Sequence, residues 1–254
     1  SGSNTFEGSA YYLGRNEQLV GGGPADTDFP DFSEQFVGGR LGGPIIEDKL
    51  FFFVSGEFET ESSPITAGLP GSGQANIFPI SESRVAQVAQ IAETQYSMEP
   101  GGFDPFTAEN DNVKFLARLD WNINPNHRLT LRHNFVDADR DRGISRDTRS
   151  FTLDSRNYSQ AHTQNTTTLE VRSNIGTSMF NEFRLNSQRI RDQADIKALQ
   201  PQVQVSVFED PETAIANQNP GATTRDIDLG TERFRHANRL DQDILEITND
   251  FTVD

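Results

Sequence analysis

The clearest pattern in the chain is a strict alternation of apolar and polar residues across positions 113–136. Odd-numbered positions such as Phe115 and Leu119 are apolar, whereas even-numbered positions such as Lys114 and Arg118 are polar. Successive side chains of a β-strand point to opposite faces. A period of two therefore predicts strands that have one apolar and one polar face.

Eight segments show this alternation, and each can supply the ~9–11 residues that a tilted strand needs to cross a bilayer. The third segment is the weakest, because phenylalanine occurs on both of its parities, and His133 is a polar misfit on an apolar parity. The predicted strands lie near residues 5–13, 32–45, 49–60, 113–124, 128–137, 162–175, 179–191 and 239–254.

The connections between these segments alternate in length. Short turns are expected at 46–49, 124–127 and 176–178, and long segments at 14–31, 61–112, 137–161 and 192–238. Short turns on one side and long loops on the other are typical of outer-membrane barrels, whose short turns are periplasmic. Loops longer than ~15 residues are uncommon in compact soluble domains. The sequence therefore predicts an all-β fold, an antiparallel transmembrane β-barrel with long extracellular loops.

One helix is expected within the second long loop. Val85, Val88, Ala92 and Tyr96 recur at helical spacing, which predicts a short amphipathic helix. We expect its apolar stripe to pack on that same loop.

The composition mainly excludes certain structures, partners and kinds of site. No apolar run approaches the ~20 residues of a membrane helix, and a net charge of −16 argues against a nucleic-acid partner. The chain has no cysteine, which excludes disulfides, thiol nucleophiles and cysteine-ligated zinc. Walker-type loops, His-Glu-x-x-His and Gly-x-Ser-x-Gly are all missing, so no enzymatic activity is predicted.

Two stretches resemble TonB-dependent receptors of the Oar-like type. QFVGGRLGGPI at 35–45, followed by DKLFFF at 48–53, resembles the early barrel hairpin of that family. SGSNTFEGSAY at 1–11 resembles the passage from its plug domain into the first barrel strand. The resemblance continues through 96–103 and 112–135 and then becomes a generic barrel pattern.

This resemblance implies a barrel of about twenty-two strands filled by a plug, of which residues 1–254 would be a partial barrel domain. It implies an outer-membrane receptor of a Gram-negative bacterium, in which external loops capture a ligand and TonB energises its passage. The implied partners are membrane lipid and lipopolysaccharide, the plug and remaining strands, the TonB complex acting through segments outside this chain, and a surface lipoprotein. Iron chelates, cobalamin, oligosaccharides, peptides and proteins are all carried by receptors of this type.

Two alternatives compete with this interpretation. A self-contained eight-stranded barrel with a structural or adhesion role predicts pairing between the strands near Phe6 and Phe251. A soluble extracellular β-sandwich that binds glycan or protein predicts that Phe115, Leu119 and Leu131, with Leu169, are buried against a second sheet.

Carboxylates at every second residue form the sharpest local motif: Asp137, Asp139 and Asp141 begin the third long loop. Such spacing can present oxygen ligands to Ca²⁺. However, Gly143 falls one place late for a calcium loop, and the intervening arginines favour a solvated, salt-bridged segment. Calcium is the one cofactor that the sequence suggests.

The polar parity predicts a charged inner wall. Mixed charges on adjacent strands suit cross-strand pairing, and these residues would either form ladders that dock the plug or line a transport path. Trp121, close to a short turn, is the candidate for an interfacial aromatic girdle. The wall residues are Arg118, Asp120, Arg132, Glu170, Arg172, Glu182 and Arg184.

Overall fold

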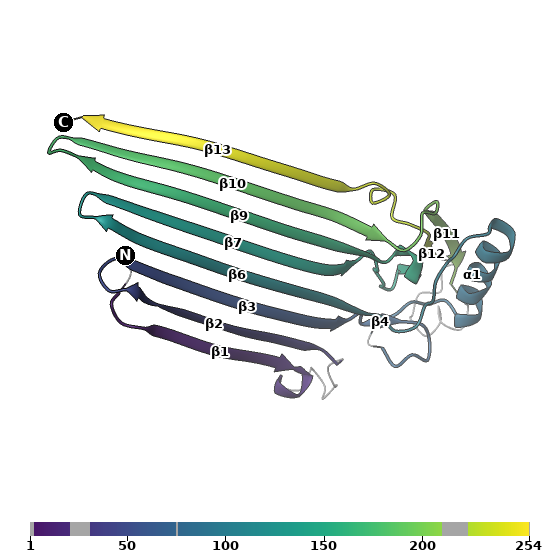
Figure 1. Cartoon of the computed structure of the whole chain (residues 1–254). Helices are drawn as coiled ribbons and strands as arrows, with labels where there is room; N and C mark the ends of the chain where they lie inside the picture. The colour runs from purple at the N-terminus through teal and green to yellow at the C-terminus, as the bar shows by residue number, and fades with distance from the viewer. Residues whose placement is uncertain (1–2, 21–30, 75, 210–222, 254) are drawn as a thin grey trace.

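The computed structural model describes residues 3–20, 31–74, 76–209 and 223–253. Its main feature is an antiparallel sheet of eight strands, each paired with its neighbours in chain order (Figure 1). The all-β prediction is therefore confirmed. The strands are β1 (Glu7–Asn16), β2 (Ser33–Ile46), β3 (Leu50–Pro64), β6 (Thr107–Asn124), β7 (His127–Arg142), β9 (Tyr158–Ile175), β10 (Met179–Ile196) and β13 (Arg239–Val253).

Three short turns lie at one end of this sheet, and the long connections lie at the other (Figure 1). Asp48, in the first turn, has a φ of 60° and is held by the side chain of Asn4, whose Oδ1 accepts from the Asp48 amide at 2.9 Å. In the second turn, Asn124 Oδ1 accepts the amides of Asn126 and His127 at 2.9 and 3.0 Å. In these tight turns, side-chain oxygens thus accept hydrogen bonds from backbone amides that would otherwise bind water.

The strands run further toward the long connections than the alternation predicts. β7 ends at Arg142, so Asp137 and Asp139 lie in a strand and not in a loop. Hydroxyl groups of β9 support this extension, because Thr163 donates to Asp137 at 2.8 Å and Ser159 donates to Asp139. Polar pairs keep the ladder intact where apolar alternation has stopped.

The apolar face of the sheet is uncovered. Phe115, Leu119 and Leu131 are 43%, 37% and 37% exposed, and they lie on neighbouring strands in one register. No described element packs over them as a second sheet. The β-sandwich alternative is therefore wrong, because it requires this face to be a buried core.

The two outer strands of the sheet have open edges. Within the described segments, β1 pairs with β2 alone and β13 with β10 alone, and the two strands lie at opposite edges of an open sheet (Figure 1). This arrangement argues against the self-contained eight-stranded barrel. An unpaired strand edge in lipid would leave backbone groups without hydrogen-bond partners.

Two glycines of the motif at 35–45 lie beneath aromatic rings. A Cβ atom added to Gly38 would lie 2.4 Å from the Tyr11 ring, and one added to Gly43 would lie 2.5 Å from Phe6. Phe6 also packs against Phe52 in a tilted arrangement, with ring centroids 6.2 Å apart. The missing side chains therefore give aromatic residues of the opening segment room to lie on β2.

Replacing Gly38 with valine should displace the Tyr11 ring and break its hydrogen bond to Glu57. Loss of one hydrogen bond and its ring packing should lower the free energy of unfolding by about 1–2 kcal/mol. Urea titration of the folded protein in detergent measures this change. Gly56→Ala is the control, because its Cβ would meet nothing closer than 3.8 Å; an equal loss in both variants would contradict the ring contact.

The second, third and fourth long connections form a compact unit beyond the sheet, which we name the loop module: residues 65–74, 76–106, 143–157, 197–209 and 223–238. It contains α1 (Glu82–Tyr96), the two-stranded pair β4 (Ala67–Gly68) and β5 (Asn76–Ile77), and a three-stranded sheet in the order β11-β12-β8. These three strands are β11 (Val203–Phe208), β12 (Thr224–Leu229) and β8 (Ser150–Thr152). The bend between β8 and β9 includes a 3-10 turn, Asp154–Arg156, and another, Glu17–Leu19, follows β1.

The helix of this module is present as predicted, but its packing differs from the expectation. Val85 and Ala92 join a buried cluster with Phe151 and Ile227, which belong to two other loops. Tyr96, expected on the apolar stripe, is 71% exposed. The stripe therefore packs on its own loop, through residues such as Phe78 and Ile80, and also on segments of two other loops.

None of the helices in the described segments has the length and apolarity needed to cross a membrane.

Candidate functional site

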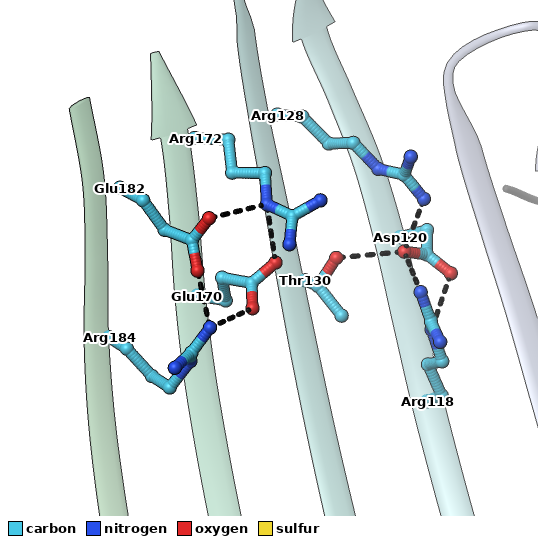
Figure 2. Close-up of polar contacts among 8 residues, drawn as sticks. All are labelled: Arg118, Asp120, Arg128, Thr130, Glu170, Arg172, Glu182 and Arg184. Carbon is cyan, nitrogen blue, oxygen red and sulfur yellow. Dashed lines mark hydrogen bonds and ion pairs between the residues drawn. The ribbon is translucent and has the colours of Figure 1, made fainter. Parts of the chain in front are cut away.

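The polar face of the sheet carries a charged surface over β6, β7, β9 and β10. It surrounds a hollow of about 700 Å³ lined by five arginines and by the two carboxylates of Glu170 and Glu246, with threonines and Asn186. All seven predicted wall residues lie on this face, and six of them are joined in two groups of ion pairs (Figure 2). The period of two placed these side chains correctly, because each occupies an even-numbered position.

The first group is a closed ring of four side chains on β9 and β10 (Figure 2). Arg172 stands opposite Glu182, and Glu170 stands opposite Arg184. Arg172 Nε lies 3.0 Å from Glu170 and 3.2 Å from Glu182. Arg184 lies 3.3 Å from Glu170 and also pairs with Glu182. Two cations and two anions neutralise one another, so this ring stiffens the wall.

The second group is centred on Asp120. Two nitrogens of Arg118 donate to its carboxylate at 2.7 and 2.9 Å. Arg128 Nη2 lies 2.8 Å from Asp120 Oδ1. Thr130 Oγ1 donates to the same carboxylate at 2.8 Å. Only 9% of the Asp120 side chain is exposed. One nearly buried anion thus holds two cations against the wall.

The second group carries excess positive charge. Arg132 lies directly opposite Arg118 and lines the same hollow, yet its guanidinium forms no ion pair within the described part of the chain. Arg118 and Arg128 therefore share the single charge of Asp120, and Arg132 adds a third positive charge beside them. The hollow is locally cationic in a chain whose net charge is −16, so it is suited to contact carboxylates or other anions.

A third polar group links the first strands of the sheet. Lys114 Nζ lies 2.9 Å from Glu57 and 3.5 Å from Glu59, and the Tyr11 hydroxyl donates to Glu57. Tyr11 therefore lies on the polar face of the sheet, opposite Gly38. Because Tyr11 and Tyr12 are adjacent, the sequence alone does not show which of the two rings lies on the polar face. Gly38, which leaves room for the Tyr11 ring, is the residue that could have indicated it.

The structure does not bring the three aspartates of the calcium motif together. Residues two apart on a strand are separated by about 6–7 Å, so their carboxylates diverge from one ion. Asp137 and Asp139 accept hydroxyls of β9, and Asp141 accepts the side chain of Asn157 at 3.2 Å. Across the described residues, no group of three or more His, Asp or Glu side chains could hold a metal ion.

Trp121 lies on the apolar face, close to the second short turn. It is 45% exposed and stands opposite Leu129 on one side and Leu50 on the other. Its role in an interfacial girdle stays a prediction.

Comparison with known proteins gives one family. Residues 1–253 match the model of an outer membrane beta barrel domain. No curated protein and no solved structure matches the chain. The open eight-stranded antiparallel sheet, with one apolar and one charged face, agrees with this match. The chain therefore belongs to the outer membrane β-barrel domain family, whose members lie in the outer membrane of Gram-negative bacteria.

Proposed function

We propose that this chain forms part of the wall of a TonB-dependent outer-membrane transporter. Its external loops capture a ligand, and the ligand passes through the barrel when TonB acts on a plug that fills the lumen. The proposed function is transport without covalent chemistry.

The observation that carries this proposal is the cationic hollow on the charged face. A wide barrel needs something to fill its lumen. A wall in which Arg118 and Arg128 share Asp120 while Arg132 lines the hollow without an ion-pair partner among the described residues favours an acidic partner there. The two open sheet edges support a barrel of more than eight strands. The resemblance of 35–45 and 48–53 to Oar-like receptors supports the TonB-dependent type.

The two ion-pair groups have different roles in this proposal. The neutral ring on β9 and β10 maintains the wall during transport. Arg132 and the Asp120 group contact acidic side chains of the plug, and they become available to the ligand when the plug moves.

Binding to TonB tests the proposal directly. The full-length protein, purified in detergent, should bind the periplasmic domain of TonB from the same organism in a saturable manner, and Arg132→Gln should leave this binding unchanged because the lumen wall is distant from the TonB contact. Surface plasmon resonance measures the interaction. Absence of saturable binding by the full-length protein would contradict the TonB-dependent type. Only the assignment to the outer membrane β-barrel domain family would then remain.

A further inference from the structure

An apolar groove runs along one side of the loop module, between α1 and β11. Its volume is about 640 Å³, within the ~300–1,000 Å³ of typical ligand sites. Ile91 lines it from α1, and Val203 and Val205 line it from β11. Ile91, Tyr96 and Leu199 along the groove are 40%, 71% and 71% exposed. Contiguous exposed apolar side chains of this kind mark interaction sites.

One wall of the groove is an open strand edge. β11 is the outer strand of the order β11-β12-β8. The Glu209 amide donates to Thr223 across the β11–β12 pair at 3.0 Å. In an antiparallel strand, every second residue directs its backbone amide and carbonyl to the same side. The backbone groups of Val205 therefore point toward β12, and those of Gln204 and Ser206 point away from β12.

Two contacts agree with this direction. The Phe208 carbonyl should also point away from β12, and it accepts a hydrogen bond from Arg84 Nη1 at 2.7 Å. On the other side of β12, the Asp226 amide donates to Arg149 at 3.0 Å. Gln204 and Ser206 are exposed, and their outward backbone groups have no protein partner within the described segments.

We propose that the loop module binds an extended polypeptide, which adds as a fourth strand beside β11 and places every second side chain in the groove between β11 and α1. A polypeptide supplies donors and acceptors at the strand repeat together with apolar groups at every second position. A compact small molecule would fill the groove but leave the strand edge without partners.

The preferred peptide alternates apolar and basic residues. The side chains of Val203 and Val205 line the groove, whereas those of Gln204 and Ser206 lie on the other face of β11. A strand added beside β11 would therefore place apolar side chains on the groove face only. A net charge of −16 favours basic residues on its other face.

This inference deepens the proposed transport by naming the class of ligand, and it rests on that proposal only for the extracellular position of the module. The experiment measures binding and not uptake. A protein that binds TonB but no peptide would overturn this inference alone, and one that binds peptide but not TonB would overturn the transport proposal alone.

The probe is a fluorescein-labelled peptide, Thr-Val-Lys-Val-Thr-Val-Lys, with an amidated C-terminus, titrated with the full-length protein in detergent. We expect saturable binding by fluorescence anisotropy. Ser206→Pro removes the outward amide and obstructs an added strand, yet proline is tolerated at such edge positions because that amide is not in the ladder. Binding should weaken about tenfold or more, as loss of one to two hydrogen bonds predicts.

Ser206→Ala is the matched control, because it removes the hydroxyl that donates to Asp226 but keeps the backbone amide. It should bind the peptide as the unmodified protein does. Ile91→Glu should also weaken binding by placing a charge in the groove, whereas Gln87→Glu, on an exposed position outside the groove, should not. A peptide of the same composition without alternation, Val-Val-Val-Lys-Thr-Thr-Lys, should bind at least about tenfold more weakly.

Hydrogen exchange gives a second measurement at the same edge. The amides of Gln204 and Ser206 should exchange rapidly in the free protein and slowly with bound peptide. Slow exchange before the peptide is added would show that another part of the protein already covers β11. That result, or equal peptide binding by the Ser206→Pro and Ser206→Ala variants, would overturn the proposal.

Discussion

Replacing Arg146 with methionine should unfold the loop module while leaving the eight-stranded sheet intact. The Arg146 side chain is 1% exposed. It donates to the carbonyl groups of Thr152 at 3.0 Å and Asp104 at 2.5 Å, and it pairs with Asp154 at 2.9 Å. Its guanidinium also lies 4.4 Å from the centroid of the Phe151 ring. Removing one partner of a buried ion pair costs about 3–5 kcal/mol. Because 29% of the Asp154 side chain is exposed, we expect a loss at the lower end of this range.

The pKa values of this pair show the cost of its burial. Burial lowers the pKa of the Arg146 guanidinium, and it raises the pKa of the Asp154 carboxyl above its usual range. Asp154 left alone would therefore be an uncompensated charge. The double substitution Arg146→Met with Asp154→Leu should recover part of the lost stability, because it removes both charges together.

Hydrogen exchange of the full-length protein in detergent measures this effect. Amides of α1, β8 and β12 should exchange much faster in Arg146→Met, and amides of β6 and β7 should not change. Arg149→Met is the control, since Arg149 is exposed on the same loop. If the module amides stay protected in Arg146→Met, Arg146 does not hold the second and third long loops together.

Replacing Asp120 with asparagine should destabilise the charged wall. Arg118 and Arg128 would keep their charges without the shared anion, and Arg132 stands opposite Arg118. Because both paired arginines are about one third exposed, solvent offsets part of the loss. We expect a decrease of about 2 kcal/mol in the free energy of unfolding, below the 3–5 kcal/mol of a fully buried pair.

The measurement is urea-induced unfolding of the protein refolded into lipid vesicles. Glu246→Gln provides the control, because Glu246 lines the same hollow but makes no ion pair within the described residues. That variant should lie within about 0.5 kcal/mol of the unmodified protein. Equal losses in the two variants would show that Asp120 has no special position in the wall.

The period of two predicted the faces of the sheet because lipid and lumen select opposite side chains along each strand. It also constrains the register between β6 and β7. Leu119 must face Leu131 and Asp120 must face Thr130 if apolar and polar residues are to stay on their own faces, since a slip of one residue exchanges the faces. The tight turn between Asn124 and His127 alone would give that slipped register. An irregularity between Asn122 and Asn124 corrects it.

The ends of the long strands could not be predicted in the same way. Around Asp139 and Arg140 both faces of β7 are polar, so no alternation of hydrophobicity marks the strand. The ladder continues there through hydroxyl-carboxylate pairs such as Ser159 with Asp139. The aspartates therefore resembled a calcium loop although they belong to a strand.

The loop module could be predicted only in fragments. Its helix is local and was visible in the spacing of Val85 and Ala92. Its core brings Phe78, Phe151 and Ile227 together from three loops, and no local pattern specifies such a meeting. The alternation of valines through β11 was a usable signal for the strand, but not for the groove that this strand forms with α1.

The apolar face of the sheet should contact lipid, and the charged face should line the lumen of the barrel. The chain has no cysteine, so single cysteines introduced along β6 can each carry a spin label without competing sites. In the full-length protein in lipid vesicles, labels at Phe115, Leu119 and Ile123 should be accessible to oxygen dissolved in the bilayer, and labels at Lys114 and Arg118 should be accessible to a water-soluble nickel complex. Equal accessibility of both parities to the nickel complex would contradict the assignment.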